Sequence, residues 1–165
     1  MANSVEFVDN SVQVTSALDA AIIAYLFEAG GELEAQVKRG TKVGTGELKN
    51  SWAYKVDNEA KTSTVGSPLE RAIWNEFGTG EYAVNGDGRK GYWVYVKGSD
   101  GQRSTSPKTY TLQEAKRIAA FMREQGLDAY YTKGMKPQHT LQTAFNSSKS
   151  TLIRRAEQIL KGRME

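Results

Sequence analysis

The residues that could do acid–base or nucleophilic chemistry are few in this chain. His139 is the only histidine and there is no cysteine, which excludes a two-histidine metal site, a thiolate metal site and disulfides. A serine hydrolase would depend on His139 alone, and no Gly-x-Ser-x-Gly run is present to expose a nucleophilic serine on a sharp turn. Beside Pro137, His139 is expected at a helix start or on the surface. We therefore expect no catalytic residue, and no enzyme.

Carboxylates and glycine-rich runs give no better site. Glu70 with Glu76, or Asp87 with Asp100, could pair as acid and base, but no motif surrounds them and solvated charges are the simpler interpretation. The runs at 78–80 and 86–88 lack the spacing of a phosphate-binding loop. We expect no cofactor, no metal and no small-molecule substrate.

Basic residues next to aromatic residues leave two interpretations open. Arg89 and Lys90 precede Tyr92-Trp93-Val94-Tyr95, which could form a stacking platform for nucleic acid or a half-buried strand beside a solvated loop. The closing helical pattern is basic as well. It could line a passage for DNA, face an acidic partner, or carry cations favoured near a helix C-terminus, with three candidate residues: Arg154, Arg155 and Lys161.

Length and composition indicate one folded domain over residues 1–165. The chain has a net charge of +3, a mean hydropathy of −0.56 and 39% hydrophobic residues, which is enough for a core without disulfides. No charged and apolar leader pattern begins the sequence, and no apolar run is expected to reach the ~20 residues that span a bilayer. We expect no membrane partner.

The first half of the chain predicts a long helix and a hairpin. Apolar residues recur at helical spacing from Ser11 or Ser16 to residue 39, although Val12 and Val14 could instead belong to a strand. Gly30-Gly31 inside this helix predicts either a kink or a closely packed neighbour. Strands are expected at 52–56 and 62–66, followed by a short helix with Ser67 as its cap and five core-facing residues: Leu69, Ala72, Ile73, Trp74 and Phe77.

The second half predicts a glycine-rich loop, then more sheet. Residues 79–91 hold four glycines and are expected to form a mobile loop. A strand at 92–96, a hairpin closed near Thr109, a helix at 111–125 capped by Thr111 with Glu114, and a strand at 128–132 would form an elaboration over residues 92–132. A closing helix is expected from Thr140 to 160. The fold class is α+β, with one antiparallel sheet of four to five strands and the long N- and C-terminal helices packed on one of its faces.

Three short runs stand in a fixed order along this pattern. The first is Val43-Gly44-Thr45-Gly46-Glu47-Leu48-Lys49-Asn50-Ser51, between the long helix and the first strand. The second is Glu76-Phe77-Gly78-Thr79-Gly80. The third, before the closing helix, contains Gly134 and Pro137.

The order of these runs resembles the tail-component family of long-tailed bacteriophages, from about residue 11 to residue 160. That family shows Pro-Val-Asp-Thr-Gly-x-Leu-x-x-Ser, then Glu-Phe-Gly-Thr-Gly, then Gly-x-x-Pro. Lys42 replaces its usual proline and Gly44 its usual aspartate. The family-motif residues matched here are Thr45, Gly46, Leu48, Ser51, Glu76, Phe77, Gly78, Thr79, Gly80 and Pro137.

The resemblance implies a structural virion protein of the phage neck. Such a protein forms or completes a ring, a hexamer in that family, at the head–tail junction or tail end, and contacts neighbouring neck and tail proteins. It is in the host cytoplasm during assembly, and non-specific contact with passing DNA is possible in such a ring. The loop supplies the expected interface residues, because a segment that becomes ordered on assembly can join subunits: Glu81, Tyr82, Asn85, Arg89 and Lys90. The alternative is a nucleic-acid-binding protein that uses the Tyr92–Tyr95 hairpin and the basic closing helix.

Overall fold

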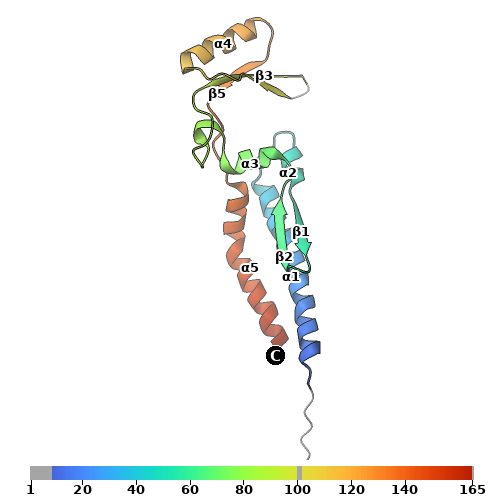
Figure 1. Ribbon diagram of the computed structural model, residues 1–165. Helices are drawn as coiled ribbons and strands as arrows, with labels where there is room; N and C mark the ends of the chain where they lie inside the picture. The colour runs from blue at the N-terminus through green and yellow to red at the C-terminus, as the bar shows by residue number, and fades with distance from the viewer. Residues whose placement is uncertain (1–8, 100–101, 165) are drawn as a thin grey trace, which may run out of the picture. The chain divides into compact units, whose positions relative to one another are not determined.

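The computed structural model describes residues 9–99 and 102–164, and Figure 1 shows its helices and strands. Where one domain was expected, the chain divides into two compact units. The terminal unit comprises Met1–Pro68 together with Leu141–Glu165, so both ends of the chain contribute to it. The central unit comprises Leu69–Thr140.

The terminal unit is built on two long helices and a hairpin. Helix α1 (Ser11–Gly40) is followed by the short helix α2 (Glu47–Ser51) and by strands β1 (Ala53–Asp57) and β2 (Thr62–Gly66), which pair antiparallel. Helix α5 (Thr140–Met164) runs beside α1, and the Tyr25 hydroxyl donates to the Leu152 carbonyl at 2.7 Å (Figure 1). Burial raises the pKa of Tyr25 above its usual value, so this hydroxyl stays a donor near neutral pH.

Helix α1 is continuous, which settles two open points. It begins at Ser11, whose backbone N–H is bonded by the Asp9 carboxylate at 2.9 Å, so Val12 and Val14 lie in the helix and not in a strand. Gly30 lies inside the helix where the hairpin crosses it. A Cβ at Gly30 would meet the Ser63 Oγ at 2.4 Å and the Tyr54 ring at 2.6 Å, whereas a Cβ at Gly31 would meet that ring only at 3.7 Å. Gly30 is therefore required by a close neighbour.

The central unit holds a three-stranded antiparallel sheet covered by one helix. Strand β3 (Trp93–Lys97) lies between β4 (Arg103–Thr105) and β5 (Ala129–Thr132). Helix α4 (Leu112–Glu124) is capped at its N-terminus by Thr111. The side chains of Thr111 and Glu114 form the predicted capping box. The core between α4 and the sheet consists of Val94, Ala115 and Ala119, with Tyr92, Tyr110, Ile118, Met122 and Tyr131 packed around it.

Helix α3 (Glu70–Phe77) differs from its prediction in two ways. It starts at Glu70 without a side-chain cap, because the Ser67 hydroxyl is hydrogen-bonded to the Ser51 hydroxyl at 2.7 Å. Ala72 is buried, but Ile73, Trp74 and Phe77 expose 59%, 45% and 47% of their surface. The prediction that these three side chains face a core was wrong, because within the described residues the core of the central unit forms between α4 and the sheet and not at α3.

The predicted α+β class, with antiparallel strands between long terminal helices, is confirmed. Within the described residues, the five strands form two sheets, of two and three strands, and not one sheet as expected. The return strand of the second hairpin is Arg103–Thr105, whereas Tyr110, near the expected strand, forms only a single bridge with Tyr92. The predicted elaboration over 92–132 lies wholly in the central unit.

The apolar surface of α1 is mostly uncovered. By length and composition alone α1 could cross a membrane, with a mean hydropathy of 1.3 over its 18-residue window, although core helices of soluble proteins meet the same criterion. This corrects the expectation that no stretch reaches that length. Only 6% of the window is buried, and the buried residues of α1 are Ala21, Gly30 and Val37.

The two adjacent glycines of α1 allow a matched test of hairpin packing. Gly30→Ala should lower the free energy of unfolding by about 2 kcal/mol, because its Cβ would displace Tyr54 and Ser63. Gly31→Ala should raise the free energy of unfolding by up to about 1 kcal/mol, because alanine favours the helix and its Cβ would make only an ordinary contact with the Tyr54 ring. Urea unfolding followed by tryptophan fluorescence measures both. Equal effects of the two substitutions would show that the hairpin does not rest on Gly30.

Candidate functional site

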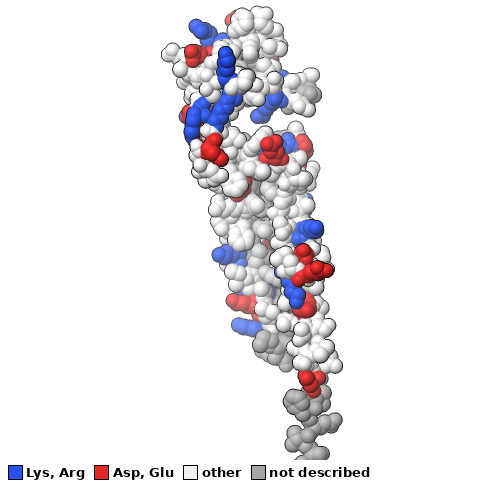
Figure 2. Space-filling view, in the orientation of Figure 1, with Lys and Arg blue, Asp and Glu red and all other residues white. Residues whose placement is uncertain are grey.

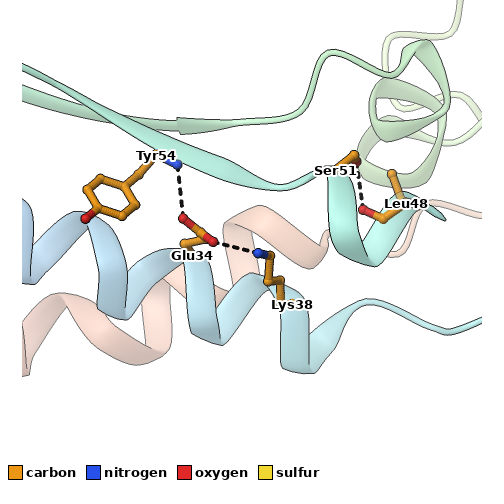
Figure 3. Close-up of polar contacts among 5 residues, drawn as sticks. All are labelled: Glu34, Lys38, Leu48, Ser51 and Tyr54. Atoms are coloured by element: carbon orange, nitrogen blue, oxygen red, sulfur yellow. Dashed lines mark hydrogen bonds and ion pairs between the residues drawn. The ribbon is translucent and has the colours of Figure 1, made fainter. Parts of the chain in front are cut away.

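The first motif run forms the turn that joins α1 to the hairpin. Gly46 caps α2 with φ of 83°, a conformation that favours glycine, and its carbonyl accepts the Asn50 N–H at 2.9 Å. The Ser51 hydroxyl donates to the Leu48 carbonyl at 2.8 Å (Figure 3) and also contacts Ser67 at the end of the hairpin. Glycine and serine at these motif positions therefore set the direction in which the chain enters β1.

A carboxylate on α1 fixes the start of that strand. Glu34 accepts a hydrogen bond from the Tyr54 backbone N–H at 3.2 Å and pairs with Lys38 Nζ at 2.6 Å (Figure 3). Trp52, just before β1, is only 3% exposed. Sequence reasoning did not single out Glu34, although its position four residues before Lys38 on one helix face was a visible signal.

The second and third motif runs contact each other through their backbones. The Thr79 N–H donates to the Met135 carbonyl at 2.9 Å, the Met135 N–H donates to the Thr79 hydroxyl at 3.0 Å, and the Glu81 N–H donates to the Lys133 carbonyl at 2.9 Å. Residues 79–81 and 133–135 therefore run side by side within the central unit.

Three glycines make this approach possible. Gly78, Gly80 and Gly134 all have positive φ, and a Cβ at each would meet backbone oxygen atoms at 2.8, 2.3 and 2.0 Å. Pro137 contributes the next contact, since its Cδ would lie 2.9 Å from a Cβ at Gly78. The motif spacing is thus explained by packing: the positions carry glycine because two backbones meet there.

The remaining motif residues divide between buried and exposed positions. Glu76 is 8% exposed, whereas Phe77, next to it, is 47% exposed. Thr45 accepts a bond from the Glu47 N–H at 3.4 Å on the surface of the terminal unit. Asn75 and Thr140, both buried, bond through their side chains within the central unit.

The expected interface loop makes many contacts of its own. The Glu81 carboxylate accepts the Gly91 N–H at 3.2 Å and pairs with Lys133 at 3.0 Å, which holds the pKa of Glu81 below its usual value. The Tyr82 ring lies under Lys133 and Lys136, at 5.1 and 5.7 Å.

Arg89 closes the loop, and the other two candidates are exposed. Its guanidinium donates to the carbonyls of Ser106 and Lys108 and lies 4.8 Å from the centre of the Trp93 ring. Asn85 and Lys90 are solvent-exposed. The mobility of residues 79–91 and their role in an interface stay predictions, and these contacts would have to yield for the loop to move.

The open face of the central sheet carries aromatic and basic side chains. Tyr92 packs under α4 with Val94, so Trp93 and Tyr95 point to the opposite face. There Tyr95 stacks on Tyr130 with ring centres 5.5 Å apart, and the Arg103 guanidinium lies 5.2 Å from the Tyr95 ring. Of the three aromatic residues considered for a stacking platform, Tyr92 therefore lies on the covered face, whereas Tyr130 lies beside Tyr95 on the opposite face. Nucleic-acid binding there stays a prediction.

Tyr130 was missed by sequence reasoning. The alternation of strand residues predicts that Trp93 and Tyr95 lie on one face of the sheet. It does not show which residues of the neighbouring strands lie beside them. The register pairs Tyr95 with Tyr130 and Lys97 with Arg103. A hydrogen bond to Asp128 raises the pKa of Tyr130. In Figure 2, Lys and Arg side chains gather over the central unit on the face that is drawn.

The three basic candidates of the closing helix lie exposed on α5. Arg155 pairs with Glu28 of α1 at 3.2 Å, with both side chains about half exposed, so the pair contributes little to stability. Arg154 and Arg155 line a small surface pocket with Glu28, Glu32 and Leu152. The role of Arg154, Arg155 and Lys161 beside DNA or an acidic partner stays a prediction.

Of the carboxylates considered for chemistry, Asp100 lies outside the described residues. Within residues 9–99 and 102–164, no group of three His, Asp or Glu side chains could hold a metal ion. His139 lies just before α5, at the helix start where it was expected, and its φ of 50° is in the left-handed region that few residues other than glycine adopt.

Comparison with known proteins supports the resemblance found in the sequence. Residues 6–78 match the family model described as "Bacteriophage HK97-gp10, putative tail-component". This confirms the resemblance to a phage tail-component family over α1, the first motif run, the hairpin and α3, and it points to a structural tail protein. No curated protein and no solved structure matches the chain. The later motif residues, including Gly134 and Pro137, lie beyond the matched part.

The backbone contact between the second and third motif runs can be tested with one substitution. Gly134→Ala should lower the free energy of unfolding by about 3 kcal/mol, because its Cβ would lie 2.0 Å from the Thr79 carbonyl. Gly86→Ala is the control, since its φ of 73° is also positive but nothing lies within 4 Å; it should cost about 1 kcal/mol. Urea unfolding compares the two. A Gly134→Ala variant no less stable than the control would contradict the close approach.

Proposed function

We propose that this protein is a structural subunit of the phage neck, which forms or completes a ring at the head–tail junction or at the tail end. The match of residues 6–78 to the phage tail-component family carries this proposal. The ordered motif residues beyond the match support it as well, since Gly80 and Gly134 serve, together with Gly78, one backbone contact within the central unit.

The surface composition supports an assembling subunit. The largest side chains that are fully buried are Val37 and Val94, and most of the other buried hydrophobic residues are alanines. Large apolar side chains such as Phe27, Trp74 and Phe145 are exposed instead. Exposed apolar surface of this extent is typical of a protein whose interfaces are formed with other subunits.

A role as a binding protein for single-stranded nucleic acid is the second candidate, and one observation favours it. The open face of the sheet combines Trp93, Tyr95 and Tyr130 with the cations Arg89 and Arg103. The net charge of +3 falls in the central unit, since Lys and Arg equal Asp and Glu in number in the terminal unit. Bases stack on aromatic faces and phosphates attract such cations.

Localisation in phage particles tests the neck proposal. Particles induced from the host and labelled with gold-bound antibody against this chain should carry gold at the head–tail junction or tail end under the electron microscope. Particles disrupted to expose inner epitopes provide the control for a hidden antigen. Gold absent from both preparations, with the antigen found only in the lysate, would overturn the proposal.

DNA affinity at two salt concentrations tests the second candidate. A protein that contacts several phosphates through Arg89, Lys97 and Arg103 should lose affinity for single-stranded DNA by a factor of about 10 or more between 50 and 200 mM salt. Tyr130→Ala should weaken that binding further by losing about 1–3 kcal/mol of stacking. Fluorescence anisotropy with a labelled oligonucleotide measures both. If the affinity for single-stranded DNA cannot be measured even at 50 mM salt, the second candidate is rejected and only the neck proposal remains.

A further inference from the structure

The loop at residues 79–91 contains the one Asn-Gly pair of the chain. Seven asparagines are present; four of them precede serine and two precede glutamate, whereas Asn85 precedes Gly86. The residue after an asparagine matters because its backbone nitrogen can attack the carbon of the side-chain amide. A side chain on that following residue hinders the attack, and glycine has none. Asn85 is therefore the asparagine whose neighbour in the chain least opposes this reaction.

Asn85 and Gly86 lie in an exposed turn. The Gly86 N–H donates to the Ala83 carbonyl at 3.0 Å, so residues 83–86 form a turn with Asn85 in its third position. Both Asn85 and Gly86 are exposed to solvent. A Cβ at Gly86 would meet nothing within 4 Å. The space around this peptide bond is therefore open, and water can reach it.

A second pair in the same loop is packed closely instead. Asp87-Gly88 has the spacing for the corresponding attack on an aspartate side chain, which releases water. A Cβ at Gly88, however, would lie 2.0 Å from the Gly80 carbonyl oxygen and 2.8 Å from the Ala83 side chain. Gly88 thus packs against neighbouring backbone and Gly86 does not. The sequence of the loop offers two reactive pairs, and the structure leaves only the first of them open.

From these observations we propose that Asn85 is a site of spontaneous covalent modification, at which its side-chain amide becomes a carboxylate. The Gly86 backbone nitrogen attacks Asn85 Cγ and gives up its proton. The bond from Cγ to the amide nitrogen breaks, that nitrogen leaves as ammonia, and a succinimide ring remains. One water molecule then opens the ring at either carbonyl, which gives aspartate or isoaspartate. In sum, one water is consumed and one ammonia is released, without oxidation or reduction.

The fold slows this reaction without preventing it. The Gly86 nitrogen can attack only while its hydrogen bond to the Ala83 carbonyl is open. A single backbone hydrogen bond of this kind lowers the population of the open turn by a factor of about ten or less. The ends of the loop are held separately, by the Glu81–Lys133 ion pair and by the hydrogen bonds of Arg89. The turn can therefore open while those contacts stay in place.

The modification changes the charge of a loop that is expected to form an interface. Residues 81–91 carry two cations and two acids, so their formal charges cancel. A carboxylate at position 85 gives the loop a charge of −1 and lowers that of the chain from +3 to +2. Isoaspartate also adds one carbon to the backbone within the turn. The inference does not depend on the neck proposal, because its reactants are the chain and water alone.

Ageing of the purified full-length chain tests the proposal. The chain is kept in mildly alkaline buffer and sampled over days by cation-exchange chromatography and peptide mass spectrometry. A form with one positive charge fewer should accumulate and elute with Asn85→Asp, which serves as the standard, and the changed residue should map to position 85. Asn58, exposed in the turn of the first hairpin but followed by Glu59, is the internal control and should keep its amide over the same time.

Two variants test the cause of the reaction. Asn85→Gln lengthens the side chain by one carbon, which disfavours ring closure, so the acidic form should not appear. Gly86→Ala places a methyl group beside the attacking nitrogen and should slow the conversion of Asn85, while the added Cβ meets no neighbouring atom. A Gly86→Ala chain that ages as fast as the natural chain would contradict the role of the open glycine.

Three other results would overturn the inference. If Asn85 keeps its amide in the folded chain but loses it in the same chain unfolded in guanidinium chloride, the fold protects the site. Equal conversion of Asn58 and Asn85 would show that the Asn-Gly pair has no special reactivity in this fold. An acidic form that appears equally in Asn85→Gln would place the modification elsewhere in the chain.

Discussion

Close contact at glycine is the constraint on which both units depend. In the terminal unit the hairpin lies on α1 only because Gly30 has no side chain where Tyr54 and Ser63 cross it. In the central unit, Gly78, Gly80 and Gly134 let two segments exchange backbone hydrogen bonds at a distance that any Cβ would prevent. Neither contact depends on a large core, which matters because the buried side chains here are few and mostly small.

That shortage of core connects stability to assembly. A chain of this length can bury large side chains within itself, yet Phe27, Trp74, Phe145 and Ile153 remain exposed. Their burial would contribute about 25 cal/mol for each Å² removed from water, and that free energy remains available to contacts with other subunits. An assembling protein gains from this arrangement because each contact stabilises the subunit and the assembly together.

The chemistry of the chain is consistent with a structural protein. Its polar groups mainly fix backbone directions: Glu34 holds the start of β1, Ser51 ends α2, and Glu81 holds its loop closed through Lys133 and Gly91. The strongest concentration of unusual side chains is the open face of the central sheet, where Tyr95 lies between Tyr130 and Arg103. Such a face suits binding through stacking and charge.

The sequence by itself determined the α+β class, the helix and strand order, and the family resemblance. These depend on local spacing: the helical recurrence of apolar residues in α1 and α5, the alternation in β1 and β3, and the capping box at Thr111. The sequence also showed where glycines interrupt those patterns.

Only the tertiary structure decided what those residues meet. Local spacing cannot show that Gly134 lies against Thr79, that Tyr130 stacks on Tyr95, or that Ser67 bonds to Ser51 and leaves α3 uncapped, because each pair joins residues distant in sequence. For the same reason the single sheet and the buried face of α3 were predicted wrongly. Apolar spacing shows which face of a helix is apolar, whereas only packing shows whether the chain has anything to cover it.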